Sequence, residues 1–277
     1  MKKLFSVFVL LSFFVGTSFA LEYEEANHKV GTLTHLNSDE KIFQTFAENF
    51  WHGGDRIFTT GSTKTPVFVF YNSLTEIMLA LDSGKVNEIS LPEDVADYIM
   101  HTTGKYAVTC IMRSEPVYIS FGFRENDETG LREKFNQELK EMGADGTLLT
   151  LIAKYIDEAG IHEPEAVNFE KFDDSDTTIR VAVTGDLPPI DYIAADGKPA
   201  GFNTAVIAEI AKRLKVNVEL VNIEAGARAA SLSSGRTDVV FWFMTYGGTV
   251  KQPDVPEKVA LSRPYYSWDE FLHIKKF

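Results

Sequence analysis

The stretch from Thr178 to Tyr266 constrains the fold most, because strands and helices alternate along it. The β-branched run TIRVAV ends in a loop rich in Gly, Asp and Pro, and the helix TAVIAEIAKRL follows. Next come the alternating strand VNVELVNI, a small-residue loop, a second helix and the apolar strand DVVFWFM. This order predicts an α/β fold with a parallel or mixed sheet and crossover helices. In such sheets, ligands bind at the carboxyl ends of the strands.

Several landmarks follow one another along this stretch. They are Pro188-Pro189, Asp196-Gly197, Gly201-Phe202-Asn203, Leu232-x-x-Gly235-Arg236-x-Asp238 and Pro264-Tyr265-Tyr266. Their order resembles the first lobe of family 3 extracellular solute-binding proteins, the substrate receptors of amino-acid-type ABC importers. The resemblance implies a two-lobed fold of the periplasmic-binding-protein kind (type II), with a hinge and an interlobe cleft.

The first half of the chain resembles the second lobe of the same family. The blocks are VGTLTHLNSDE, LTEIMLALDSGKVNEI and the segment from Phe121 to Ile156 with its DGT turn. They precede the first-lobe block instead of following it, which implies a circularly permuted order. The acidic segment 157–177 would be the connector that joins the family's usual ends. We therefore expect lobe two at 28–113 and lobe one at 114–277.

The local patterns of the first half predict its elements. We expect strands at KVGTLT, VFVFY, VNEIS, YAVTCIM and PVYISFGF, and helices at 37–51, 75–84, 92–102, 126–142 and 147–156. The block order also predicts that the strand Phe271–Lys275 lies beside the lobe crossing at 113–119. Both ends of the mature chain should then lie at the hinge.

The first twenty residues have the pattern of a secretory signal peptide. Lys2-Lys3 precede an apolar run from Leu4 to Val15, and a small-residue end precedes Leu21. The alternative is an N-terminal membrane anchor, for which the apolar run is short. No cysteine stands at the cleavage point, so we expect no lipid anchor. The pattern predicts a periplasmic or secreted protein without direct membrane insertion.

Charge and motifs exclude several classes of function. The formal net charge of −13 would become −15 without Lys2 and Lys3, which argues against nucleic acid as a partner. Cys110, the only cysteine, lies in the apolar run YAVTCIM and reads as a core residue. The six histidines form no metal-binding pattern, and no nucleophile elbow or phosphate-binding loop occurs. We expect no metal, no cofactor and no catalytic residues.

The resemblance places ligand contacts in the first loop of lobe one. Thr184, Asp186 and Leu187 occupy it. Asp186 has an alternative interpretation as a turn residue.

Arg228 stands among small residues at a helix start, where the resemblance directs it into the cleft. Helix N-termini favour negative charge, and guanidinium pairs with carboxylate in a bidentate manner. Arg228 is thus the expected grip on an anionic ligand group. The alternative is a surface salt bridge to Glu224 or Asp238.

The strand that ends near Thr245 supplies further candidates. Trp242, Phe243 and Thr245 stand where the family often has small hydroxyl residues, so we expect an apolar or aromatic wall. The alternative for Phe243 is a core position. The family's following Thr-x-x-Arg is missing, because the segment from Tyr246 to Gln252 contains no arginine.

Lobe two offers three more candidates. The resemblance expects an acid that grips an α-ammonium group just after VNEIS; direct alignment reaches Pro92, and a one-residue slip reaches Glu93. The predicted helix start at Asn37 would present backbone N–H groups to an anion. His35 precedes it as a ligand contact, with a solvated loop histidine as the alternative.

Together these features predict a monomeric solute-binding protein. It would capture a small polar ligand, an amino acid or related carboxylate, for the membrane permease of an ABC importer. One alternative is a dehydratase-like enzyme on the same fold, with Glu93 and Asp186 as its acid and base. Another is a sensor that presents its ligand to a membrane receptor.

Overall fold

A computed structural model describes residues 28–33, 40–53, 55–59, 65–161, 166–246 and 255–277. The predicted signal peptide lies outside these residues, as do His35 and Asn37. Within the described ranges, no helix combines the length and apolarity needed to cross a membrane.

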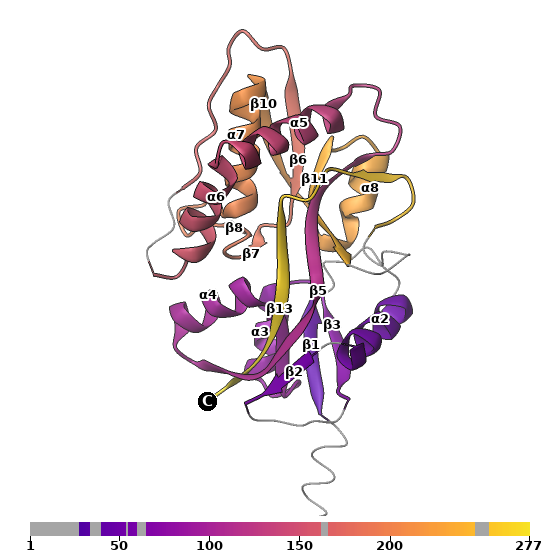
Figure 1. Ribbon diagram of the computed structural model, residues 1–277, viewed down its shortest axis with the longest axis vertical. Coiled ribbons are helices and arrows are strands. Elements are labelled where there is room, and N and C mark those ends of the chain that lie inside the picture. Colours follow the sequence, from indigo (N-terminus) through magenta and orange to yellow (C-terminus); the bar gives the residue numbers. More distant parts are fainter. Residues whose placement is uncertain (1–27, 34–39, 54, 60–64, 162–165, 247–254) are drawn as a thin grey trace, which may run out of the picture.

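One large mixed sheet runs along the molecule (Figure 1), in the strand order β10-β6-β11-β5-β13-β4-β1-β3. Strands β2 and β12 also pair with β5, and three short strands form a second sheet. The strands of the large sheet are β1 (Lys29–Leu33), β2 (Asp55–Phe58), β3 (Val67–Tyr71), β4 (Glu88–Pro92), β5 (Tyr106–Arg124), β6 (Thr178–Val183), β10 (Asn217–Asn222), β11 (Val239–Tyr246), β12 (Val259–Leu261) and β13 (Tyr266–Lys276). Those of the small sheet are β7 (Asp186–Leu187), β8 (Asp191–Ile193) and β9 (Pro199–Ala200).

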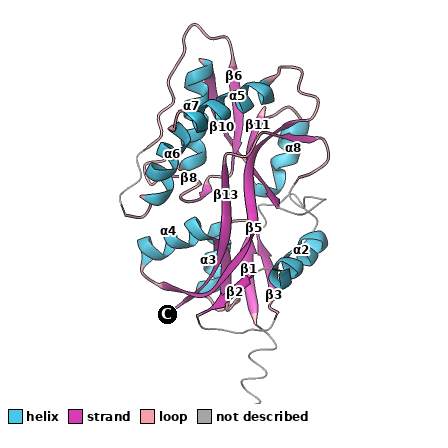
Figure 2. Cartoon of the chain, viewed as in Figure 1, coloured by secondary structure: helices cyan, strands magenta, loops and turns pink. Residues whose placement is uncertain are grey.

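Helices flank the strands in two halves (Figure 2). The lower half carries α2 (Glu40–Gly53), α3 (Leu74–Asp82) and α4 (Glu93–Thr103). The upper half carries α5 (Leu131–Ala144), α6 (Thr147–Ile152) with its π-helical end η1 (Ala153–Asp157), α7 (Phe202–Leu214), η2 (Ala225–Ala227) and α8 (Arg228–Ser233). Helices α5 and α6 pack on α7, although they precede it by many residues. The expected two-lobed α/β fold is confirmed.

Two long strands, β5 and β13, join the halves. They pair antiparallel from Tyr266 opposite Ile119 to Lys276 opposite Tyr106. The segment Phe271–Lys275 pairs with residues 107–112 of β5. The prediction that it lies beside residues 113–119 was therefore wrong by several positions. The second half of β13 also pairs with β4 in the lower half. The lobe boundary at 113/114 stays a prediction. That boundary would assign all of β13 to lobe one, whereas the second half of β13 pairs with β4 in the lower half.

The sequence predicted two strands where the structure has the single strand β5. Pro116, which lacks the N–H that a ladder needs, lies within β5. The structure accommodates it because no described strand pairs with residues 114–116: the β13 register jumps from Trp268 opposite Val117 to Glu270 opposite Arg113. This interruption lies where β5 passes from one half to the other, and we call residues 114–116 with Asp269 the crossing gap.

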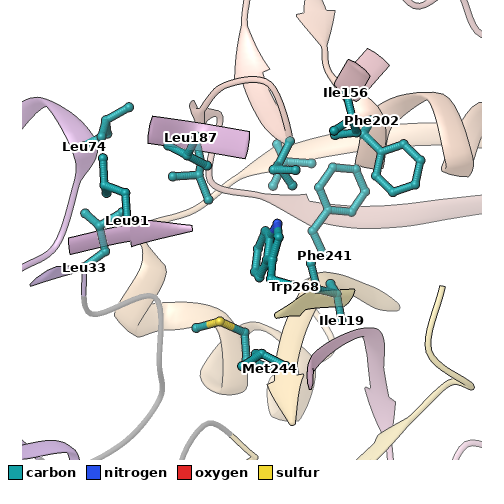
Figure 3. Close-up of a cluster of buried hydrophobic side chains, with 14 of the residues drawn as sticks. Leu33, Leu74, Leu91, Ile119, Ile156, Leu187, Phe202, Phe241, Met244 and Trp268 are labelled. Atoms are coloured by element: carbon teal, nitrogen blue, oxygen red, sulfur yellow. The ribbon is translucent and has the colours of Figure 1, made fainter. Parts of the chain in front are cut away.

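The hydrophobic core is continuous through both halves (Figure 3). Leu187 of the upper half lies toward Leu74 and Leu91 of the lower half, and Trp268 on β13 belongs to the same cluster. The indole Nε1 of Trp268 donates to Asp94 Oδ2 at 2.7 Å, and the Tyr266 hydroxyl donates to the same oxygen at 2.6 Å. Asp94 on α4 therefore ties the lower half to Tyr266 and Trp268 of β13.

The start of β1 and the end of β13 flank the same strand. Val30 pairs with Glu88 of β4 on one side, and Ile274 pairs with Ile89 on the other. Glu88 Oε2 lies 3.3 Å from His28 Nε2 and 3.6 Å from His273 Nδ1. This adjacency is what a circularly permuted block order requires. The start of β1 and the end of β13 lie at the far end of the lower half, and not at the hinge, where both ends of the mature chain were expected.

The close packing of β5 against β11 can be tested at Gly122. A Cβ at this position would overlap the Phe243 ring, whereas a Cβ at Gly143, near the end of α5, meets nothing within 4 Å. We expect Gly122→Ala to lower the free energy of unfolding by about 1–3 kcal/mol through overpacking. Gly143→Ala, the matched control, should raise it by up to ~1 kcal/mol. Urea denaturation measures both; equal stabilities would contradict the packing described.

The pH dependence of stability can be tested at Glu93, the first residue of α4. Partial burial, followed by the charges of Glu270 and Asp94, raises the pKa of Glu93 to about 7. In the unfolded chain the pKa returns to about 4.3. The folded state thus binds the proton more tightly, so its stability falls as the pH rises from about 4.3 through the folded pKa.

We expect Glu93→Gln to flatten this loss of stability. The variant should melt at a higher temperature than the parent at pH 8, because glutamine carries no charge to desolvate. At pH 4 the two should be equal. Glu128→Gln, on an exposed turn, is the control and should follow the parent at both values. The interpretation fails if Glu93→Gln and the parent lose stability in parallel.

Candidate ligand-binding cleft

A cavity of about 440 Å³ lies between the two halves. The lower half contributes the residues at the end of β3 and the start of α3, and the upper half contributes loops after β6 and β10. The lining residues are Asn72, Ser73, Glu76, Thr184, Asp186, Asn222, Ile223, Glu224 and Gly226. The cavity therefore lies at the carboxyl ends of parallel strands, as expected for this class of sheet.

The lower wall is the capped N-terminus of α3. Ser73 is the N-cap residue, and its hydroxyl accepts a hydrogen bond from the Glu76 backbone N–H at 3.1 Å. The Glu76 carboxylate reaches back and accepts from the Asn72 N–H at 3.1 Å. Leu74, Ile77 and the other buried residues of α3 hold the helix on the core. The polar end of α3 is thereby fixed at the cavity.

The upper wall begins with the loop after β6. The turn passes through Gly185, whose φ of 73° favours glycine. Asp191, 1% exposed, accepts from both the N–H and the hydroxyl of Thr184 at 3.0 Å. Burial nevertheless raises the pKa of the Asp191 carboxyl to about 6. These contacts orient Thr184 and Asp186 toward the lower half.

The remainder of the upper wall comes from β10. This strand pairs parallel with β6, with Asn222 opposite Val183, so the loops after both strands meet at one edge. Asn222 at the end of β10 and Ile223, Glu224 and Gly226 after it line the cavity, with Ile223 largely buried.

Asp186 connects the two walls directly. Its Oδ2 accepts a hydrogen bond from the backbone N–H of Leu74 at 3.1 Å, across 112 positions of sequence. Leu74 is the first residue of α3, so a carboxylate of the upper half occupies the positive end of a helix of the lower half. Tyr98 on α4 and Tyr192 on β8 make a second contact across the halves, with ring centroids 6.2 Å apart.

Of the predicted site residues, Thr184 and Asp186 line the cavity. Leu187 and Phe243 are instead core residues, 1% and 0% exposed. Thr245 is half-buried on β11 and does not belong to the lining. The side chain of Trp242 lies outside the described part of the structure, as do His35 and Asn37. A ligand-binding role for the predicted residues stays a prediction.

Arg228 begins α8 close to the upper wall but is only 1% exposed. Its guanidinium carbon lies 4.9 Å from the centroid of the Phe243 ring, a cation–π contact. The guanidinium therefore packs inward. The small neighbours of Arg228 had suggested instead that its side chain would project into the cleft. It is not among the lining residues.

Glu93 also lies apart from the cavity lining, at the start of α4. The two carboxyl groups that the enzyme alternative would pair, those of Glu93 and Asp186, are thus not both on the cavity. Among the described residues, no group of three or more His, Cys, Asp or Glu side chains could hold a metal ion.

The sequence analysis missed Asn72, Ser73, Glu76 and Asn222 as lining residues. A signal for them was present: Asn72-Ser73 follow the strand VFVFY directly and precede a helix, which is the arrangement considered at Asn37-Ser38. Applying the rule of carboxyl strand ends to every strand would have found this position.

Comparison with protein-family models finds a match at residues 179–276. This segment matches the family model of bacterial extracellular solute-binding proteins, family 3. A search among curated protein sequences finds no match.

Three solved structures illustrate the similarity in shape. The ligand-binding component of an ABC-type import system from Staphylococcus aureus, with zinc bound, is 11% identical, with 90% of this chain and 65% of that chain covered and a TM-score of 0.45. The protein AgaA from A. tumefaciens R10, in complex with agropinic acid, is 14% identical, with 76% and 54% covered and a TM-score of 0.42. The methionine binding protein MetQ is 11% identical, with 91% and 84% covered and a TM-score of 0.41.

The chain spans 65% and 54% of the length of the first two of these proteins. At such identities and TM-scores, these structures support no conclusion about the ligand or the fold of this chain. The description of the fold rests on its own helices and strands. The match of residues 179–276 confirms the resemblance seen in the sequence: this segment has the sequence pattern of bacterial extracellular solute-binding proteins of family 3.

Proposed function

We propose that the protein is a solute-binding protein that captures a small polar ligand between its two halves. One observation carries the proposal: a cavity of about 440 Å³ takes its lining from both halves. The family match of residues 179–276 supports it, because this segment supplies the whole upper wall. A volume of this size suits a small molecule.

The geometry suggests how binding would work. Among the described strands, only β5 and β13 extend through both halves, and the crossing gap interrupts their ladder. A bend at this gap would move the two walls of the cavity relative to each other. A ligand that contacts both walls interacts best with the closed state and shifts the population toward it.

The same proposal includes the protein's place in the cell. Export by the segment 1–20 would put a monomeric protein in the periplasm or outside the cell. There it would deliver its ligand to the membrane permease of an ABC importer. The amino-acid ligand expected from the sequence is one candidate, and its ammonium group suits the carboxylates of the cavity. The role proposed is binding, not catalysis.

Mass spectrometry of molecules that co-purify with the protein should identify the ligand. Adding that ligand to stripped protein should then raise stability by mass action, by ~2.7 kcal/mol at a hundredfold excess over Kd. Small-angle scattering should show a smaller radius of gyration in the bound state. A ligand that binds without changing either quantity would argue against closure.

A variant that fills the cavity supplies the control. Gly226 lines the cavity, and a Cβ there meets nothing within 4 Å, which is also true of Gly143 on α5. We expect Gly226→Phe to abolish the ligand-induced melting shift while the unliganded protein melts near the parent value. Gly143→Phe should bind as the parent does. Normal binding by Gly226→Phe would place the ligand elsewhere.

A further inference from the structure

We propose that the cleft selects a small organic cation with N–H donors, such as an alkylamine or a guanidine, and that this ligand needs no carboxylate group. The inference rests on the proposed function and names the ligand class for the same site. It departs from the anionic group that the sequence led us to expect at Arg228.

The charges on the cavity carry the first step. Three of the nine described lining residues are acids, Glu76, Asp186 and Glu224, and none is lysine or arginine. Glu76 and Glu224 are exposed, and Asp186 is half-buried. A cleft lined by one sign of charge concentrates counter-ions of the other sign, because its walls focus the field. The described surface therefore attracts cations and repels anions.

The second step concerns the end of α3, the feature best suited to an anion. Helix N-termini bind anions through free backbone N–H groups and the positive end of the helix dipole. Here the Leu74 N–H already donates to Asp186, the Glu76 N–H to the Ser73 hydroxyl and the Asn72 N–H to the Glu76 carboxylate. The protein's own acceptors thus use donors that an anionic ligand would need.

Arg228 does not reverse this charge balance at the cavity surface. Its side chain is 1% exposed and stacks over Phe243, away from the lining. The polar lining offers carboxylate, amide and hydroxyl groups without a cationic donor among the described residues. Such a surface matches the several N–H donors of an ammonium or guanidinium group.

The third step links charge to closure. Glu76 belongs to the lower wall, whereas Asp186 and Glu224 belong to the upper wall. Closing the halves brings carboxylates of like charge nearer to one another, which opposes closure when the cavity holds only water. A cation between the walls turns this repulsion into attraction on both sides. Cation binding and closure would therefore stabilise each other.

Three probes with a four-carbon skeleton test the ligand class: putrescine, 4-aminobutanoate and succinate. We expect putrescine at millimolar concentration to raise the melting temperature and succinate to leave it unchanged, with 4-aminobutanoate between them. Calcium chloride and tetramethylammonium are further arms, because they carry positive charge without N–H donors. Neither should reproduce the putrescine effect.

Isothermal titration of putrescine into two variants tests the site. Glu76→Gln keeps an acceptor for the Asn72 N–H but removes the charge, and should weaken binding by about tenfold or more. Glu128→Gln removes an acid of the same type from an exposed turn, and should bind as the parent does. Equal loss in both variants would mean that net charge alone attracts the probe, and would overturn the proposal.

The remaining outcomes separate this inference from the proposed function. Binding of succinate but not putrescine would overturn the cation proposal and leave a solute-binding role intact. A putrescine effect matched by calcium chloride would also overturn it, in favour of a metal ion. Failure of putrescine to bind, together with an anionic molecule co-purifying with the protein, would do the same. Selective putrescine binding that requires Glu76 would support the proposal.

Discussion

The antiparallel ladder between β5 and β13 is the constraint on which the rest of the structure depends. It is the part of the sheet that reaches both halves, and its neighbours β4 and β11 attach one half each. Its register shifts twice, between His273 and Ile274 and at the crossing gap, and the crossing gap lies where the halves meet. Proline is tolerated there because no ladder hydrogen bond is required of it. The same two strands, β5 and β13, thus hold the two walls of the cavity in place and would allow them to move relative to each other.

The cleft is already bridged by the protein itself. Asp186 reaches from the upper wall to the first N–H of α3, and Asp94, which is not among the lining residues, accepts from Tyr266 and Trp268. Both are carboxylates that accept hydrogen bonds from another element, Asp186 from helix α3 and Asp94 from strand β13. The contact of Asp94 involves Trp268 of the apolar core, whereas Asp186 lines the cavity. A ligand in the cavity would therefore meet the contact between Asp186 and the Leu74 N–H before that of Asp94.

The alternation of strands and helices, and the landmarks of residues 178–266, were sufficient to predict the fold class and the side of the sheet that carries the cleft. Local patterns were less successful where tertiary pairing decides the outcome. The two strands expected at YAVTCIM and PVYISFGF are the single strand β5, because the gap in the β13 register accommodates Pro116. Arg228 among small residues suggested an exposed grip, but its guanidinium packs inward over the ring of Phe243 on the next strand, β11. The lining at Asn72 and Ser73 was predictable, since both follow a strand directly.

The position of β13 has a consequence for the order in which the chain can fold. This strand follows every other described strand in sequence, yet it lies in the middle of the sheet, between β5 and β4. Strands β1, β3 and β4 can pair soon after synthesis, but joining β5 to β4 waits for residues more than 150 positions further on. Long-range pairing of this kind is slow, because chain entropy is lost before contacts form. The late arrival of this central strand would keep the two halves of the sheet unjoined until the last residues of the chain have been synthesised.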